Sequence, residues 1–289
     1  MNKQAPFISI LCIVFALIGC DRGGNKNITT SETIAPGADM EESVPPHLDV
    51  RVIEDTIIGR WTLKTAISAN DVVINATDYT LNDSSVFVTL AYDNNPIFSD
   101  KEIRTKDLMG EDGEYQMYWG GGLHWYSDST IYLSFGCFLP DTDFGWPMLY
   151  QIKKDGECDI IHIDYELGVD GFDVVSEFMT LYFCERAAGV PDTDLIPLFH
   201  RYCTENATSK LLDGTIGFST SNIDFHQAYN TMSITWDSTD STDYESPLIF
   251  SVEWKPLPGD GNVKDGINIT VNSTENKIDQ ITCPYRKII

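Results

Sequence analysis

SVFVTLAYD, residues 85–93, is the stretch from which the fold of this chain is most readily read. Val86, Val88 and Leu90 alternate with side chains of mixed character. This two-residue period is typical of a β-strand that buries one face, because successive side chains of a strand point to opposite sides. We therefore predict a strand here that packs one face against a core.

The same pattern extends on both sides, from Ile57 to Tyr165. Short runs rich in β-branched and aromatic residues are separated by turn clusters; they include GRWTLKT, DVVIN, STIYLSFGCFL, PMLYQIKK and CDIIHID. Asp155-Gly156 stands between the last two runs and is a hairpin signal. We therefore predict an all-β domain over residues 55–168, built as a β-sandwich or small barrel.

After Gly168 the hydrophobic period changes to that of a helix. A first stripe at spacings of three and four predicts an amphipathic helix and contains Phe172, Val175, Phe178, Met179, Tyr182 and Phe183. A second stripe consists of Leu195, Leu198, Phe199 and Tyr202. A third helix is predicted with Thr204 as its N-cap and Gly214 at its end.

Strand-like runs follow the predicted helices. LIFSVEWK, residues 248–255, alternates strictly, and TMSITWD, INITVN and IDQITC add further strands. Helices followed by a meander predict an α+β domain over residues 169–289, with the helices packed on a curved antiparallel sheet. The fold class predicted for the whole chain is thus mainly β plus α+β.

The N-terminus has the composition of an export signal. One lysine is followed by an apolar run from Phe7 to Ile18 and then by Gly19-Cys20. This run is shorter than the roughly 20 apolar residues that a membrane-spanning helix needs. We predict that residues 1–19 are a signal peptide. The ending LIGC resembles the bacterial lipobox, which implies cleavage before Cys20 and lipidation of its sulfur.

Residues 20–54 are rich in Gly, Ser, Thr, Asn, Pro and acids, and they contain few large apolar side chains. Such a segment buries too little surface to fold by itself. We predict a flexible tether that, as a random coil, spans on the order of 30 Å. The expected location is outside the cytoplasm, anchored to a bacterial envelope membrane through acylated Cys20.

The chain of 289 residues carries a formal net charge of −25. Because phosphate backbones are also negative, this charge disfavours nucleic acid as a partner. After Cys12 and Cys20 are set aside, Cys137, Cys158, Cys184, Cys203 and Cys283 remain, without a C-x-x-C spacing. Their disulfide pairing cannot be assigned from spacing, and Cys184 with Cys203 is the pair to test first.

Several of these segments resemble known protein families. The stretches SVFVTLAYDNNPIFSDKEIRTKDL and LSFGCFLPDTDFGWPMLYQIKKDGECDI resemble a family of small lipoproteins from Bacteroides-type bacteria. FMTLYFCERAAG, LIPLFHRYCTENATSKLLDG and NITVNSTENKIDQI resemble an envelope domain family with a cystatin-like or nuclear-transport-factor-like α+β fold. Both resemblances imply fold and location; neither family brings an assigned function or a catalytic residue.

Acidic loops raise the question of a metal site. Pro-Asp-Thr-Asp occurs at residues 140–143 and again at 191–194, and each copy offers two carboxylates, whereas calcium needs about six to eight oxygens. Turn formation explains both copies better. The acidic loop 237–243 and the EF-hand-like stretch from Asp260, which has Lys264 at the fifth ligand position, are interpreted as loops. We therefore predict neither a metal site nor a cofactor.

Two sets of residues are candidates for a ligand or active site. In WGGGLHWY, His124 lies near Trp119 and Trp125 in sequence and could line a pocket for a sugar or an apolar ligand. In NIDFHQAY, an extended backbone would place Asp224 and His226 on one face, where a carboxylate could orient an imidazole.

The function predicted from the sequence is a non-catalytic, lipid-anchored envelope protein that binds a protein or a small ligand. Two alternatives stay open. One is an acid–base enzyme that uses Asp224 and His226. The other is a structural module that calcium stabilises.

Overall fold

The computed structural model describes residues 50–75, 77, 80–110, 115–142, 144–164, 171–213, 223–236, 247–258 and 263–282, and the backbone of 285–288. Residues 47–289 form one compact unit. The predicted signal peptide, Cys20, residues 21–49 and Cys283 lie outside the described residues.

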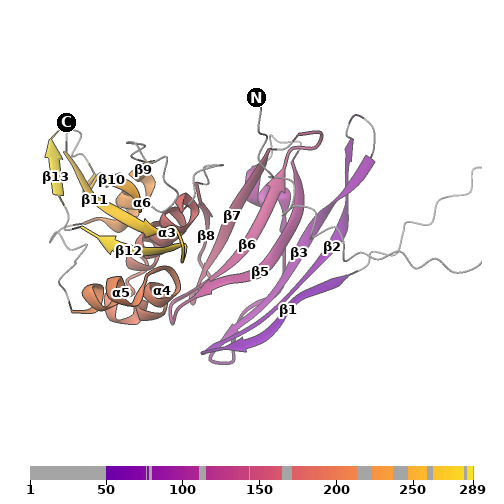
Figure 1. The fold of residues 1–289 in the computed structure, drawn as a ribbon. Coiled ribbons are helices and arrows are strands. Elements are labelled where there is room, and N and C mark those ends of the chain that lie inside the picture. Colours follow the sequence, from indigo (N-terminus) through magenta and orange to yellow (C-terminus); the bar gives the residue numbers. More distant parts are fainter. Residues whose placement is uncertain are drawn as a thin grey trace, which may run out of the picture. The chain divides into compact units, whose positions relative to one another are not determined.

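The first sheet is an antiparallel meander in the order β1-β2-β3-β4 (Figure 1). Its strands are β1 (Arg51–Ile58), β2 (Trp61–Asn75), β3 (Thr80–Tyr92) and β4 (Asn95–Arg104). Val86, Val88 and Leu90 are buried along β3, which confirms the predicted strand. Residues 51–54, predicted as the end of the tether, belong to β1 instead, because this β-branched segment pairs with β2 from Arg51 onward.

The second sheet is another antiparallel meander, in the order β5-β6-β7-β8. Its strands are β5 (Gln116–Tyr126), β6 (Thr130–Phe138), β7 (Gly145–Lys153) and β8 (Cys158–His162). A short helix, α2 (Thr105–Met109), which the sequence pattern did not indicate, precedes it. The predicted turn at Asp155-Gly156 joins β7 to β8, and Gly156 adopts φ 90° there, a value that favours glycine.

The two sheets face each other as a β-sandwich. The core between them takes Trp61, Leu63 and Val88 from the first sheet and Leu133 and Phe135 from the second, all fully buried or nearly so. Because the sheets are separate meanders, the sandwich alternative of the fold prediction is the one observed.

The second sheet is covered on its outer face as well. Tyr132, Leu149 and Ile161 belong to a second hydrophobic core that also contains Phe178 and Leu181 of the following helix. Strand β6 is therefore buried on both faces, and the second sheet contributes residues to both hydrophobic cores.

The helices of the second half are α3 (Phe172–Ala187), the 3-10 helix η1 (Asp192–Leu195), α4 (Ile196–Tyr202), α5 (Glu205–Leu212) and α6 (Phe225–Thr231). Thr204 caps α5 as predicted, because its Oγ1 accepts a hydrogen bond from the amide of Ala207. The amphipathic character predicted for α3 is wrong. Leu181, Cys184 and Glu185 are buried together with the predicted stripe, because the sandwich covers the side of the helix that was expected to face solvent.

The third sheet is antiparallel, with the order β12-β11-β10-β9 and with β13 paired to β11. Its strands are β9 (Ser233–Trp236), β10 (Leu248–Trp254), β11 (Val263–Asn272), β12 (Lys277–Ile281) and β13 (Tyr285–Ile288). Phe250, Val252 and Trp254 are fully buried against the helices, as the alternation predicted. The protein is thus mainly β with an α+β second half, and its three sheets are all antiparallel.

Among the described residues, no helix has the length and hydropathy to cross a membrane.

Candidate functional site

Strand register brings three polar side chains into one row on the outer face of the second sheet. Tyr132 on β6 pairs with Gln151 on β7, and Gln151 pairs with Asp159 on β8. Tyr132 and Gln151 are buried, and Gln151 Nε2 donates a hydrogen bond of 2.7 Å to the Tyr132 hydroxyl. The row therefore leads from the core to the exposed carboxylate of Asp159 at the sheet edge.

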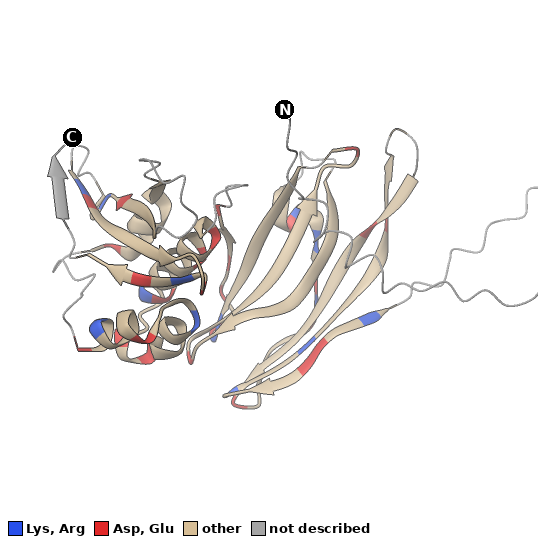
Figure 2. Ribbon diagram, viewed as in Figure 1, with Lys and Arg blue, Asp and Glu red and all other residues tan. Residues whose placement is uncertain are grey.

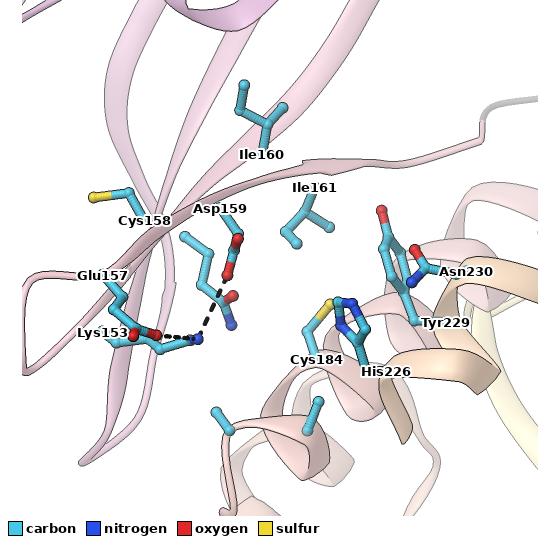
Figure 3. Close-up of a pocket in the computed structure, with 13 residues that line it drawn as sticks. Lys153, Glu157, Cys158, Asp159, Ile160, Ile161, Cys184, His226, Tyr229 and Asn230 are labelled. Atoms are coloured by element: carbon cyan, nitrogen blue, oxygen red, sulfur yellow. Dashed lines mark hydrogen bonds and ion pairs between the residues drawn. The ribbon is translucent and has the colours of Figure 1, made fainter. Parts of the chain in front are cut away.

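A pocket of about 560 Å³ opens where this row reaches the edge of the sheet (Figure 3). One wall is the hairpin of β7 and β8, and the other is formed by the end of α3 and by α6. The residues that line it are Gln151, Lys153, Glu157, Cys158, Asp159, Ile160, Ile161, Cys184, Ala187, Ala188, His226, Tyr229 and Asn230. A volume of this size is typical of sites for small molecules.

The hairpin wall carries a three-membered charge cluster. Lys153 Nζ lies 2.9 Å from Glu157 Oε2 and 3.5 Å from Asp159 Oδ2. Glu157 and then Asp159 raise the pKa of Lys153, an effect that burial partly opposes, so the lysine stays charged. One cation against two carboxylates leaves this wall with a net negative charge. Figure 2 shows the acidic and basic residues along the ribbon.

Helix α6 supplies the opposite wall and is fixed to the sheet edge. The Tyr229 hydroxyl accepts a hydrogen bond of 3.0 Å from the His162 amide and donates one of 3.3 Å to the His162 carbonyl. Burial raises the pKa of Tyr229 to about 12, so the phenol is neutral near neutral pH. His226 is exposed and lies on the pocket side of the helix (Figure 3).

The structure does not form the predicted pairing of Asp224 with His226. The backbone is not extended at this point. Asp224 is the N-cap of α6, and its Oδ1 accepts a hydrogen bond of 3.0 Å from the Gln227 amide. Within the described residues no hydrogen bond or ion pair joins the two side chains. His226 belongs to the pocket, whereas Asp224 begins the helix that carries it.

The structure places His124, Trp119 and Trp125 in different surroundings. Trp125 is buried in the second core, whereas the Trp119 ring lies against Gly136, where an added Cβ would come within 2.4 Å of the indole. His124 is half-buried, and its Nε2 lies 3.9 Å from Glu177 Oε2. Burial lowers the pKa of His124, although Glu177 opposes this shift.

The four cysteines within the described residues are free thiols, so Cys184 and Cys203 are not bonded to each other. This was the pair to test first. Cys184 lines the pocket, whereas Cys203 follows α4 and forms an isolated β-bridge with Ile278 of β12. Burial raises the pKa of both thiols, and that of Cys203 to about 12. Neither thiol is therefore activated as a nucleophile.

The acidic motifs that were interpreted as turns accept hydrogen bonds from neighbouring parts of the fold. Asp141 adopts a left-handed backbone with φ 64°, and its Oδ2 accepts a hydrogen bond of 2.7 Å from the Thr77 hydroxyl. Asp192 is the first residue of the 3-10 helix η1, and its Oδ1 accepts a hydrogen bond of 3.1 Å from the Tyr182 hydroxyl. Lys264 to Val271 are part of strand β11, which excludes an EF-hand loop over this stretch. The loops at 237–246 and 259–262 lie outside the described residues, and within those residues no cluster of three or more metal-binding side chains occurs.

Sequence reasoning missed a buried carboxyl group behind the pocket. Glu185 of α3 is fully buried, and its Oε1 accepts a hydrogen bond from the Thr130 hydroxyl of β6. Burial raises the pKa of Glu185, and the hydroxyls of Thr130, Ser127 and Tyr132 oppose part of this rise. No short-range signal identifies it, because its partners lie in another element far along the chain.

Comparison of the sequence with known protein families and with curated proteins finds no match.

Proposed function

We propose that this protein is a non-catalytic binding module whose pocket between the β7–β8 hairpin and helix α6 holds a small polar ligand. The main observation behind the proposal is that helix α6 encloses the polar edge of the second sheet and so forms a pocket. Helix α6 is itself held in place, because its Tyr229 hydrogen-bonds to His162 at that edge. Two of the potentially reactive groups at the pocket are held in unreactive states. The thiol of Cys184 and the phenol of Tyr229 both have raised pKa values because they are buried.

The pocket favours a ligand that donates hydrogen bonds. Glu157 and Asp159 are acceptors, and the carbonyl of Gln151 is left for a ligand because its amide nitrogen is committed to Tyr132. A ligand with a negative charge would face the excess carboxylate of the hairpin wall and the net charge of −25. Amines and uncharged polyols therefore fit the pocket better than carboxylates.

A thermal-shift panel with the purified full chain tests this proposal. We expect amines or polyols to raise the melting temperature, because a ligand that binds the folded state stabilises it, and matched carboxylates to leave it unchanged. Asp159→Asn should reduce the shift several-fold, whereas Asp128→Asn, the same charge change in an exposed turn outside the pocket, should not. Equal shifts with carboxylates, or no shift with any class, would contradict the proposal.

We also propose that the module is exported and anchored by lipid at Cys20. The support is the sequence of residues 1–20, with a positive start, a short apolar core and the LIGC ending. Mass spectrometry of the mature protein tests the anchor. We expect an acylated Cys20 at the N-terminus, and an intact initiator methionine with a free thiol at Cys20 would refute the proposal.

The two alternative functions have less support. An acid–base enzyme would need Asp224 to orient His226, but Asp224 caps helix α6 instead. A calcium-stabilised module would need a cluster of acidic ligands, and the described residues contain none.

A further inference from the structure

Two reactive side chains meet where the edges of the two sandwich sheets come together. Lys101 lies on β4, an edge strand of the first sheet, and Cys158 lies on β8, an edge strand of the second. Lys101 Nζ is 3.4 Å from Cys158 Sγ. The two residues are 57 positions apart in the chain, so the sandwich fold is what places the amine against the thiol.

The contacts around this pair hold both groups in place. The Cys158 thiol donates a hydrogen bond of 3.5 Å to the Gly156 carbonyl, while the Lys101 ammonium lies 4.2 Å from the centre of the Phe98 ring and 5.5 Å from that of Tyr150. Lys101 makes no ion pair with a carboxylate of the described residues, although the chain has 44 acidic residues. Its polar neighbours are the Cys158 sulfur, to which it donates a hydrogen bond, and the side chain of Tyr150.

Cys158 also differs from the other described thiols in its accessibility. Cys137, Cys184 and Cys203 are buried, whereas Cys158 and Lys101 are both partly exposed. Figure 3 shows the Cys158 sulfur directed away from His226 and Asp159, so it faces the sandwich edge and not the centre of the pocket. A small oxidant can therefore reach this thiol while the Lys101 amine lies beside it.

We propose that Cys158 and Lys101 form an oxidation-sensitive pair that a peroxide converts into a covalent bridge between the two sheets. In the first step the thiolate attacks the peroxide: an S–O bond forms, the O–O bond breaks, and water leaves, which yields a sulfenic acid. In the second step the deprotonated amine attacks this sulfur: an S–N bond forms, the S–O bond breaks, and a second water leaves. Overall, R–SH, R′–NH₂ and H₂O₂ give R–S–NH–R′ and two H₂O, and sulfur supplies the two electrons that reduce the peroxide.

The covalent bridge would restrict the motion of the pocket wall as well as join the two sheets of the sandwich. Residue 158 begins the strand that carries Asp159, and Glu157 precedes it in the same hairpin. A bond from this point to β4 would fix one wall of the pocket to the first sheet. It would also close a long loop of the chain, which stabilises a fold chiefly by restricting the unfolded state.

Peptide mass spectrometry of the full chain tests the proposal. The reduced protein is treated with limited hydrogen peroxide, its remaining thiols are alkylated, and it is digested. We expect the peptides that contain Lys101 and Cys158 to be joined, with a mass two hydrogens below their sum, and a thiol reductant to separate them. This joined form should be the main oxidation product of Cys158.

Two variants separate the bridge from oxidation alone. Lys101→Arg keeps the positive charge but removes the nucleophilic amine, so Cys158 should still be oxidised and the link should be lost. Lys64→Arg, on an exposed position of the first sheet, should leave the link unchanged. If the unaltered chain yields unlinked Cys158 acids, or a disulfide from Cys158 to another cysteine, the proposal is wrong; this result does not depend on how the variants fold.

Discussion

At the scale of single residues, the buried carboxyl of Glu185 offers a direct test of how a charge affects the stability of this protein. It lies between α3 and β6 without a cationic partner of its own among the described contacts, and the hydroxyl of Thr130 is its hydrogen-bond donor. A buried charge that lacks full compensation is costly. This carboxyl therefore binds its proton more tightly in the folded than in the unfolded chain.

Glu185→Gln should stabilise the protein at neutral pH. The amide keeps the shape and can accept the Thr130 hydrogen bond, while the charge is removed; we expect a gain of about 1 kcal/mol, or a few degrees in melting temperature. Because the folded-state pKa of Glu185 is raised, the cost of its charge is present above that pKa and disappears as the pH falls toward ordinary carboxyl values. The advantage of the variant should therefore shrink as the pH is lowered from neutral toward ordinary carboxyl pKa values. An advantage that is constant over this range would show that the charge is not the cause.

At the scale of elements, helix α6 determines whether the pocket has a second wall. Its seven residues are too few to be stable alone, so the Asp224 cap and the Tyr229 contacts to β8 hold it. His226, Tyr229 and Asn230 all reach the pocket from this one element. Loss of the cap should therefore affect binding and not only stability.

Asp224→Ala should cost about 1 kcal/mol of stability and also weaken ligand binding. Thr204→Ala is the matched control, because Thr204 caps α5 with the same kind of side-chain hydrogen bond but lies outside the pocket. We expect similar decreases in melting temperature for the two variants and a smaller ligand-induced shift for Asp224→Ala alone. Equal ligand-induced shifts would mean that α6 is not part of the site.

The sequence predicted the elements better than the site they form. Alternation identified β3 and β10, and three-and-four spacing identified α3, because these patterns are local. Helix α6 was missed, although Asp224 followed by Gln227 three positions later is a helix-start signal. The pocket was not predictable, because it depends on the register that pairs Tyr132, Gln151 and Asp159 and on a helix more than 60 residues further along the chain.

At the scale of the whole molecule, the central feature is the second sheet, which serves two cores. One face packs in the sandwich, and the other packs against α3 through Tyr132, Leu149 and Ile161. The two predicted domains therefore stabilise each other, because separation of the helical part would expose apolar surface of the sandwich to water.

Residues 47–289 should consequently unfold in one transition. Leu149→Ala removes a side chain that is only 2% exposed from the shared core, and we expect it to cost about 2 to 5 kcal/mol. Circular dichroism in the far ultraviolet and tryptophan fluorescence should then shift together in a urea titration of the full chain. Two separate transitions, with only one of them moved by the substitution, would contradict a shared core.

The pocket itself is tested most directly by histidine resonances in an NMR titration of the full chain with an amine or polyol that raises its melting temperature. His226 lies at the pocket, and His124 lies at the other site suggested by the sequence. We predict that the imidazole signals of His226 shift and saturate with ligand while those of His124 stay in place. Shifts at His124 with none at His226 would contradict the assignment of the binding site.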